Sequence, residues 1–196
     1  IYAHPMSIRS LPGRDGILDA AARRFLDEGY AETSVRDIAA DVGVKAASIY
    51  YHFESKDEVL ATILDEGIAR ITATVEAALE AVAEAAPAER LGVAMAAHLA
   101  ALFEHGPYTA AHVAVFPSAP ESVREAGLRA RDAYEGIWAG LLEEAHRDGA
   151  LAGGDDLGVV RLALLGAMNG SLQWFDPEGP RSLDEVASTI AACFVR

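Results

Sequence analysis

The sequence is poor in cysteine, in basic residues and in long hydrophobic runs, and each shortage excludes a class of protein. Its one cysteine, Cys193, has no partner within the 196 residues, which excludes a disulfide-stapled secreted scaffold. No apolar run approaches the roughly 18 residues of a transmembrane helix. The first residues lack the apolar stretch of a secretory signal. We therefore expect a cytoplasmic protein without a membrane partner.

The shortage of basic residues is uneven along the chain. Lys and Arg number 16 against 30 Asp and Glu, which gives a net charge of −14. Residues 1–56 hold 7 Lys or Arg and 8 Asp or Glu, whereas residues 57–196 hold 9 and 22. The acidity therefore belongs to the second segment. A nearly neutral first segment is compatible with a few phosphate contacts per subunit, doubled by dimerisation.

The composition favours a folded, helical protein. Hydrophobic residues make up 52% of the chain and charged residues 23%, proportions typical of globular proteins. Alanine is abundant and clusters of β-branched residues are few, which favours helices over strands. Apolar spacing, capping residues and helix breakers divide the chain into about nine helices. We predict an all-α fold with helices over residues 14–28, 35–42, 45–53, 56–86, 88–105, 109–115, 119–147, 157–175 and 183–195.

A helix-turn-helix pattern precedes the long fourth helix. Ser34 and Asp37 have the spacing of a capping box that opens a short helix. Gly43 stands where a helix-ending turn requires a positive φ. In the next short helix, Ile49 and Phe53 lie four residues apart and are expected to face inward. Two short helices joined by a glycine-containing turn define the motif, and donors and flat rings on the second helix suit a DNA major groove.

The same region resembles a known family of DNA-binding proteins. Residues 17–60 contain, at fixed spacing, A-x-x-x-F, G-Y, T-S-V-x-D-I-A, V-G-V, I-Y-Y-H-F and S-K. This combination is similar to the DNA-binding domain of the tetracycline-repressor (TetR) family of bacterial transcription regulators. The resemblance implies three helices in a first domain, six in a second, and a ligand-responsive regulator that binds double-stranded operator DNA. Two residues depart from it: Lys45 replaces a small hydroxyl residue, and Ala47 replaces a frequent glycine.

The DNA contacts are predicted from the chemistry of the residues and from the family resemblance. Lys45, at the start of the second short helix, can donate to guanine or to phosphate, and Ser48 lies about one turn further on. Ala46 can touch a thymine methyl group or simply allow close approach to the DNA. By resemblance, the Y-Y-H-F segment and the lysine after it hold phosphates. The predicted set is Thr33, Lys45, Ala46, Ser48, Tyr50, Tyr51, His52 and Lys56.

Polar residues of the second domain are candidates for lining an effector pocket. His98 and His112 offer hydrogen bonds among apolar residues, and Asn169 is an amide that requires partners if it is buried. Ordinary core packing is the competing interpretation. There is no His pair at i, i+4 and no H-E-x-x-H motif, so neither a metal nor another cofactor is expected. The predicted effector set is His98, Leu102, His112, Tyr134, Trp138 and Asn169.

The eighth and ninth helices, residues 157–175 and 183–195, are expected to form a homodimer surface. Small residues recur along the eighth helix and permit close helix approach in a four-helix interface. Packing within the chain is the alternative. The small residues are Gly158, Ala163, Gly166, Ala167 and Gly170.

The C-terminal region carries a second, shorter resemblance. The run L-L-G-A-M-N-G-S-L-Q-W-F is similar to TetR-type regulators of fatty-acid and sterol breakdown, some of which respond to acyl-CoA thioesters. It implies an acyl-CoA or another hydrophobe as effector, and a drug-like or aromatic molecule is the main competitor. The acidity of this domain disfavours an anionic ligand unless Arg124, Arg129 or Arg131 faces its phosphates.

These features divide the chain into a flexible arm (1–13), a helix-turn-helix DNA-binding domain (14–56) and an effector-binding and dimerisation domain (57–196). The predicted function is a repressor that its effector releases from the operator. Two alternatives stay open: a DNA-binding protein without an effector, and a helical enzyme with a vestigial helix-turn-helix. The enzyme is the weaker one, because no paired carboxylates, nucleophile–base pair or cofactor motif stands out.

Overall fold

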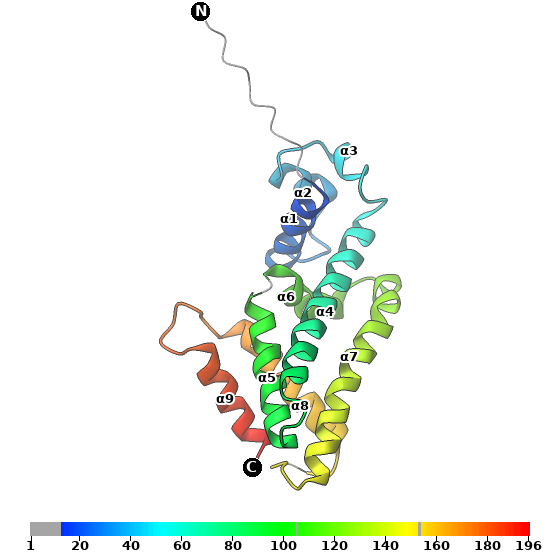
Figure 1. The fold of residues 1–196 in the computed structure, drawn as a ribbon. Coiled ribbons are helices and arrows are strands. Elements are labelled where there is room, and N and C mark those ends of the chain that lie inside the picture. Colours follow the sequence, from blue (N-terminus) through cyan, green and yellow to red (C-terminus); the bar gives the residue numbers. More distant parts are fainter. Residues whose placement is uncertain (1–12, 105, 153) are drawn as a thin grey trace, which may run out of the picture.

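The computed structural model describes residues 13–104, 106–152 and 154–196, which contain nine α-helices, two 3-10 helices and no strand (Figure 1). The all-α prediction is confirmed. The predicted arm, residues 1–13, lies outside the described residues except for Gly13. The elements are α1 (Arg14–Asp27), α2 (Val35–Asp41), α3 (Ala46–Ile49), α4 (Lys56–Ala81), α5 (Pro87–Glu104), α6 (Pro107–Ala114), η1 (Phe116–Ser118), α7 (Glu121–Arg147), α8 (Leu157–Gly170), η2 (Ser171–Gln173) and α9 (Leu183–Phe194).

The helices form two groups that α4 joins. Figure 1 shows α1, α2 and α3 at one end of the molecule, and α4 running from there alongside α5 and α7. α8 packs against α5 and α7, and α9 lies against α5. At 1.5 Å per residue, the 26 residues of α4 make a helix about 39 Å long. One helix therefore reaches from the helix-turn-helix into the larger group.

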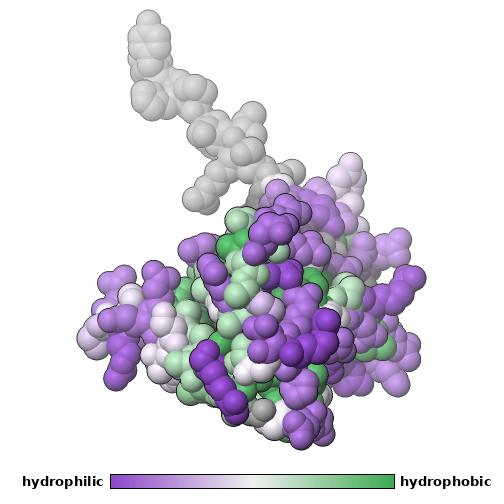
Figure 2. Space-filling model, turned by 60° about the horizontal axis from the view of Figure 1, so that its bottom comes forward, coloured by the Kyte–Doolittle hydropathy of each residue, from purple (hydrophilic) through white to green (hydrophobic). Residues whose placement is uncertain are grey.

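The surface seen in Figure 2 is largely hydrophilic, and hydrophobic residues lie mostly between the polar ones. This agrees with the 30 Asp and Glu residues of the chain. Over the described ranges, no helix combines the length and the apolar character that crossing a bilayer requires.

Side-chain caps start several helices as the sequence predicts. The Ser34 hydroxyl accepts from the N–H of Asp37, and the Asp37 carboxylate accepts from the N–H of Ser34, which completes the capping box of α2. Ser182 and Glu185 form the same box at the start of α9. Gly43 has a φ of +72° and makes the turn between α2 and α3, where a side chain would be strained.

The second helix of the helix-turn-helix is shorter than predicted. α3 has four residues, whereas the sequence pattern suggests a helix over residues 45–53. The chain continues in turns, because the N–H groups of His52 and Phe53 both donate to the carbonyl oxygen of Ile49. Ile49 and Phe53 are nevertheless buried, as expected. Ile49 and Phe53 therefore face inward as predicted, although the regular helix ends at Ile49.

Two long helices also end before their predicted ends. α4 stops at Ala81 instead of residue 86, because Val82 leaves the helical region with φ −125° and ψ 33°. α8 stops at Gly170 instead of residue 175. There the chain tightens into η2, and the Ser171 hydroxyl donates to the carbonyl oxygen of Met168 at 2.6 Å.

Buried side chains form two hydrophobic clusters. The first unites α1, α2 and the start of α4 with α6, and it includes Phe25, Leu60 and Tyr108. The second begins at Ile68 on α4 and fills the space among α5, α7 and α8. Gly67 lies between them, and a Cβ here would be 2.9 Å from the carbonyl carbon of Tyr108 and closer still to its oxygen. α4 and α6 are thus in backbone contact at the junction of the two clusters.

Candidate DNA-binding face and ligand cavity

α3 and the turns after it present polar side chains and rings to solvent. Lys45 is the N-cap residue of α3 and is exposed, with Ala46 half-buried beside it. Tyr50 is exposed, and Tyr51 is 86% exposed with its ring edge-on to that of His52 at 5.2 Å. An open hollow of about 620 Å³ is lined by Gly13, Ile17, Val44, Lys45, Ala47, Ser48, Tyr51 and His52. Donors and flat rings are thus gathered on one outward face.

Thr33, in contrast, is turned into the protein. It is 2% exposed, and its hydroxyl donates to the carbonyl oxygen of Gly29 at 2.9 Å. This bond ties the connection between α1 and α2 together. Because the side chain is buried and its donor is engaged, we leave Thr33 out of the proposed DNA contacts.

Lys56, the first residue of α4, also binds the connection between α1 and α2. Its Nζ donates to the carbonyl oxygens of Tyr30 and Thr33 at 2.7 and 2.8 Å and lies 4.0 Å from the centre of the Tyr30 ring. The Tyr30 hydroxyl donates to the Asp57 carboxylate, and burial raises the pKa of Tyr30. An ammonium has three N–H donors, so one remains for a phosphate. Tyr30 and Asp57 are outside the predicted DNA-contact set; the G-Y pair is a sequence signal for Tyr30, and Asp57 has no such signal.

A cavity of about 90 Å³ lies in the larger group, between α4, α5, α6, α7 and α8. Among the predicted effector residues, those that line it are His98, His112, Tyr134 and Asn169. Leu102 and Trp138 are buried in the second cluster and do not line the cavity, because their side chains pack into the core around it. The remaining lining residues lie outside the predicted effector set: Ile68, Ile71, Thr109, Val113, Pro117, Arg131, Glu135 and Leu165.

His98 joins α5 to α7 and α8 through two hydrogen bonds. Its Nδ1 lies 2.6 Å from the hydroxyl of Tyr134, and its Nε2 lies 2.9 Å from Oδ1 of Asn169. Because the amide oxygen only accepts, Nε2 carries the proton and the Tyr134 hydroxyl donates to Nδ1. Burial lowers the pKa of His98 to about 4. The imidazole is therefore neutral at pH 7 and fixed in one tautomer.

His112 connects the cavity to α4. Its Nδ1 donates to the carbonyl oxygen of Leu64 at 3.1 Å, so its Nε2 is a free acceptor in the neutral ring. Burial, and then the charge of Arg131, lower the pKa of His112 to about 4. Among the described residues, no three His, Cys, Asp or Glu side chains are grouped so as to hold a metal ion.

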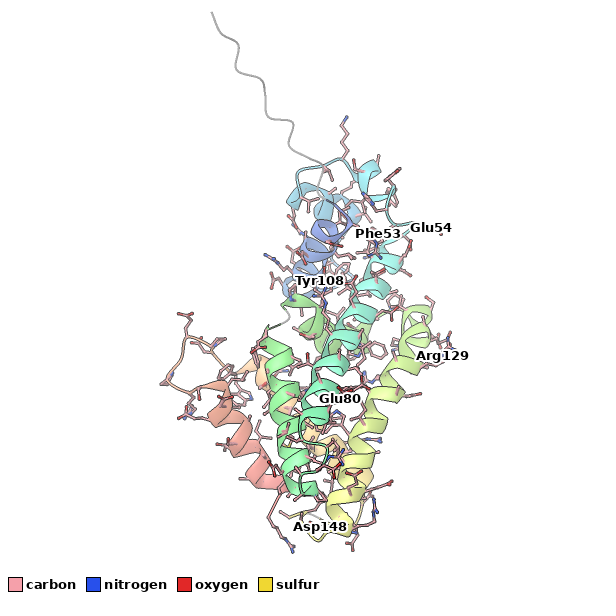
Figure 3. The ribbon with its side chains drawn as sticks, viewed as in Figure 1. Phe53, Glu54, Glu80, Tyr108, Arg129 and Asp148 are labelled. Atoms are coloured by element: carbon pink, nitrogen blue, oxygen red, sulfur yellow. The ribbon has the colours of Figure 1, made fainter. Side chains whose placement is uncertain are left out.

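The charged end of the cavity is formed by Arg131 and Glu135 of α7. Arg131 Nε donates to Oε1 of Glu135 at 3.1 Å, and the guanidinium lies 4.8 Å from the centre of the Phe116 ring. Arg161 of α8 lies 3.4 Å from Oε2 of Glu135. Arg129, also considered from the sequence, points outward from α7 (Figure 3) and does not line the cavity.

α8 carries an apolar face that the described chain leaves uncovered. Leu162 is 64% exposed, and Val159 is exposed beside it. Ala163 and Gly166 are exposed at the matching helical positions. Trp174, just after η2, is a further exposed aromatic side chain. Exposed apolar groups gathered in this way mark interaction surfaces.

Sequence models of two protein families match the chain. One, described as "Bacterial regulatory proteins, tetR family", covers residues 17–63, and the other, "Tetracyclin repressor-like, C-terminal domain", covers residues 84–196. The chain belongs to the TetR family. This confirms the family expected from the motifs, and the TetR chain is a DNA-binding transcriptional regulator.

Similar proteins and solved structures align along most of the chain. The HTH-type transcriptional repressor KstR2 of Mycolicibacterium smegmatis is 28% identical over 187 residues, which cover 91% of this chain and 87% of that protein. The TetR family transcriptional regulator PfmR from Thermus thermophilus is 31% identical with a TM-score of 0.76, covering 90% of this chain and 94% of that one. AibR, solved in complex with isovaleryl coenzyme A and operator DNA, shares the fold with a TM-score of 0.80 at 23% identity, covering 91% and 95% of the two chains.

Proposed function

We propose that the protein is a homodimeric cytoplasmic repressor that leaves its operator when a small molecule occupies the cavity. The observation that carries this proposal is the course of α4. Its first residue, Lys56, holds the connection between α1 and α2, and its middle, through Ile68 and Ile71, forms a wall of the cavity. A change at the cavity wall is therefore transmitted to the helix-turn-helix by one continuous helix.

The DNA-binding role rests on the outward face of α3. We assign Lys45 and Ser48 to base edges in the major groove and Ala46 to close approach, with the ring-bearing residues after α3 on phosphates. Lys56 has one N–H left for a phosphate. In a dimer, two such faces would read half-sites about 34 Å apart, or a multiple of that distance, on one side of the duplex.

Dimerisation through α8 and α9 is supported by the exposed apolar face of α8. Val159 and Leu162 lose their contact with water if the same face of a second copy covers them. The neighbouring Ala163 and Gly166 are small enough to let two helices approach closely. Because residues 1–56 carry almost no net charge, two copies are needed to gather enough phosphate contacts.

Release follows from the size of the cavity and from the packing of α4. Pockets that hold drug-sized ligands are typically about 300–1,000 Å³, whereas this cavity measures about 90 Å³. A ligand must therefore displace a wall, and α4 is backed by α6 at Gly67. We propose that α4 and α6 shift together and change the spacing of the two recognition faces. An acyl-CoA or another hydrophobe is the proposed effector, in line with the complex of AibR with isovaleryl coenzyme A.

Of the two alternatives, a regulator without an effector is the one that an observation favours. A cavity of about 90 Å³ holds only about three waters, and a protein whose helices never open would have no room for a drug-sized ligand. Such a protein would bind its operator equally well in the presence of every candidate molecule. The helical enzyme gains no comparable support.

The test is a fluorescence-anisotropy titration of the full chain against the DNA upstream of its own coding sequence. We expect saturable binding at low salt and release by short- and medium-chain acyl-CoA thioesters. Binding that no ligand reverses would favour the regulator without an effector. Failure to bind this DNA at low salt would overturn the proposed repressor.

A further inference from the structure

The cavity has a buried neutral end and a charged end that faces solvent. At the neutral end, His98 is bonded to Tyr134 and Asn169 deep in the helical group. At the other end, the side chains of Arg131 and Glu135 are 39% and 25% exposed. A ligand that enters from solvent on this side passes these two charged residues and the exposed Pro117.

This entrance carries an excess of positive charge. Arg131 and Arg161 share one carboxylate, that of Glu135, at 3.1 and 3.4 Å. The Nε of Arg161 is buried and has no hydrogen-bond partner within the described ranges. The histidines of the cavity do not add charge, since burial keeps both neutral. Together, Arg131, Arg161 and Glu135 carry a charge of +1, whereas the whole chain has a net charge of −14.

Arg131 is held in place with part of its hydrogen-bonding capacity unused. Its guanidinium stacks near Phe116, and only its Nε is bonded to Glu135. In the described part of the chain its Nη atoms have no hydrogen-bond partner. The planar fork of an arginine matches the two oxygens of a carboxylate or the oxygens of a phosphate. The positive charge and the free N–H donors of Arg131 therefore favour binding of an oxyanion.

We infer that the effector carries an oxyanion, a carboxylate or a phosphate, that binds Arg131 and competes with Glu135 for it. This inference rests on the proposed function, because it takes the cavity as the effector site. The apolar part of the ligand lies inward against Ile68, Ile71 and Leu165. At about 30 Å³ per water-sized volume, the 90 Å³ of the cavity accept a chain of about three carbon atoms before the helices move.

The experiment measures the affinity of the full chain for four probes by isothermal titration calorimetry. The probes are butanoate, its neutral counterpart butanamide, free coenzyme A and butanoyl-CoA. We expect butanoate, butanoyl-CoA or both to bind about tenfold more tightly than butanamide. Binding of butanoate assigns the oxyanion to a carboxylate, whereas binding of butanoyl-CoA alone assigns it to a phosphate. Free coenzyme A then shows whether the phosphates suffice without the acyl chain.

Substitutions test whether Arg131 causes the preference for the charged probe. Arg131→Gln should lose the preference for the charged probe, and Arg131→Lys should keep part of it. Glu135→Gln should bind the charged probe several-fold more tightly, because the competing carboxylate is gone. Arg129→Gln, on the outward side of the same helix, is the matched control and should behave as the wild type. Helix content by circular dichroism shows that each variant is folded.

Three results overturn the inference: equal affinity for butanoate, butanoyl-CoA and butanamide; unchanged binding of the charged probe by folded Arg131→Gln; or no binding of any probe. The operator titration separates these results from a failure of the proposed function. If butanamide releases DNA as readily as the charged probes do, the proposed repressor function is supported and the inferred oxyanion site is wrong. If the wild-type chain does not bind DNA, the proposed repressor function is wrong instead.

Discussion

Gly67 of α4 faces the peptide carbonyl of Tyr108 in α6 with no room for a side chain. A Cβ at this position would lie 2.9 Å from the carbonyl carbon and 3.2 Å from the Cβ of His112. The Tyr108 ring is in turn covered by the guanidinium of Arg70 at 4.1 Å, at the place where α6 meets α1 and α4 (Figure 3). At this contact α4 and α6 pack backbone to backbone, and α4 continues from there to the cavity in one direction and to the helix-turn-helix in the other.

Substitution of Gly67 tests that contact. Gly67→Ala should lower the free energy of unfolding by about 1–3 kcal/mol, because the neighbour is backbone and cannot move aside cheaply. Urea denaturation followed by circular dichroism measures the change. Gly136→Ala on α7 is the control: its Cβ meets open space, so helix propensity should stabilise that variant by up to about 1 kcal/mol. Equal effects of the two substitutions would contradict the close packing.

Lys56 should contribute both to stability and to DNA affinity. Lys56→Ala removes two hydrogen bonds to the connection between α1 and α2, which should cost about 1–3 kcal/mol of unfolding free energy. It should also weaken binding to all DNA sequences and lower the slope of log K against log salt by about 0.9. A salt titration of DNA binding separates the roles: loss of stability with an unchanged slope would leave Lys56 as a structural residue alone.

Stability should fall in acid because two buried histidines are neutral. The pKa of His98 and that of His112 are each lowered from 6.5 to about 4. Between these values the unfolded chain binds more protons, so the free energy of unfolding decreases as the pH falls from 6.5 towards 4, by about 1.4 kcal/mol per pH unit for each histidine. Above pH 6.5 this contribution is complete and constant.

Urea denaturation from pH 4.5 to 7 measures this dependence. His112→Gln should be less steep than the wild type by about 1.4 kcal/mol per pH unit. His146→Gln, at an exposed position of α7, should keep the wild-type slope. If the two variants have the same slope, the proposed cause of the acid sensitivity is wrong.

The apolar face of α8 should hold the dimer together. Leu162→Asp places a charge in the proposed interface and should convert the dimer to a monomer with its helix content intact. Leu128 of α7 is also exposed, and Leu128→Asp is the control that should remain dimeric. Light scattering coupled to size-exclusion chromatography gives the mass of each variant. A dimeric Leu162→Asp protein would place the interface elsewhere.

Local features of the fold could be predicted from the sequence because they depend on neighbours in the chain. The capping boxes at Ser34 and Ser182 and the turn at Gly43 need only residues a few positions apart. The inward orientation of Ile49 and Phe53 follows from helical spacing in the same way. The family motifs add the order of the domains.

Features that depend on how helices rotate against one another could not be predicted. Thr33 is polar and next to a cap, yet it is buried in the connection between α1 and α2, where its hydroxyl donates to the carbonyl oxygen of Gly29. Trp138 lies four residues after Tyr134 on α7 but packs into the core beside the cavity. The charge cluster at the entrance needs Arg161 of α8 to reach α7, and no spacing within the chain reveals that pairing.

Filling the cavity should move α4 and release DNA, and a cavity-filling variant tests this relationship without a ligand. Val113 lines the cavity from α6 and is not part of the DNA-binding face, and Val113→Trp should force the helices apart as we propose that an effector does. We measure operator affinity by fluorescence anisotropy for wild type and variant at equal helix content. We expect operator affinity to be about tenfold or more weaker in the variant, the size of a typical allosteric coupling. Unchanged operator affinity in a folded Val113→Trp protein would contradict it.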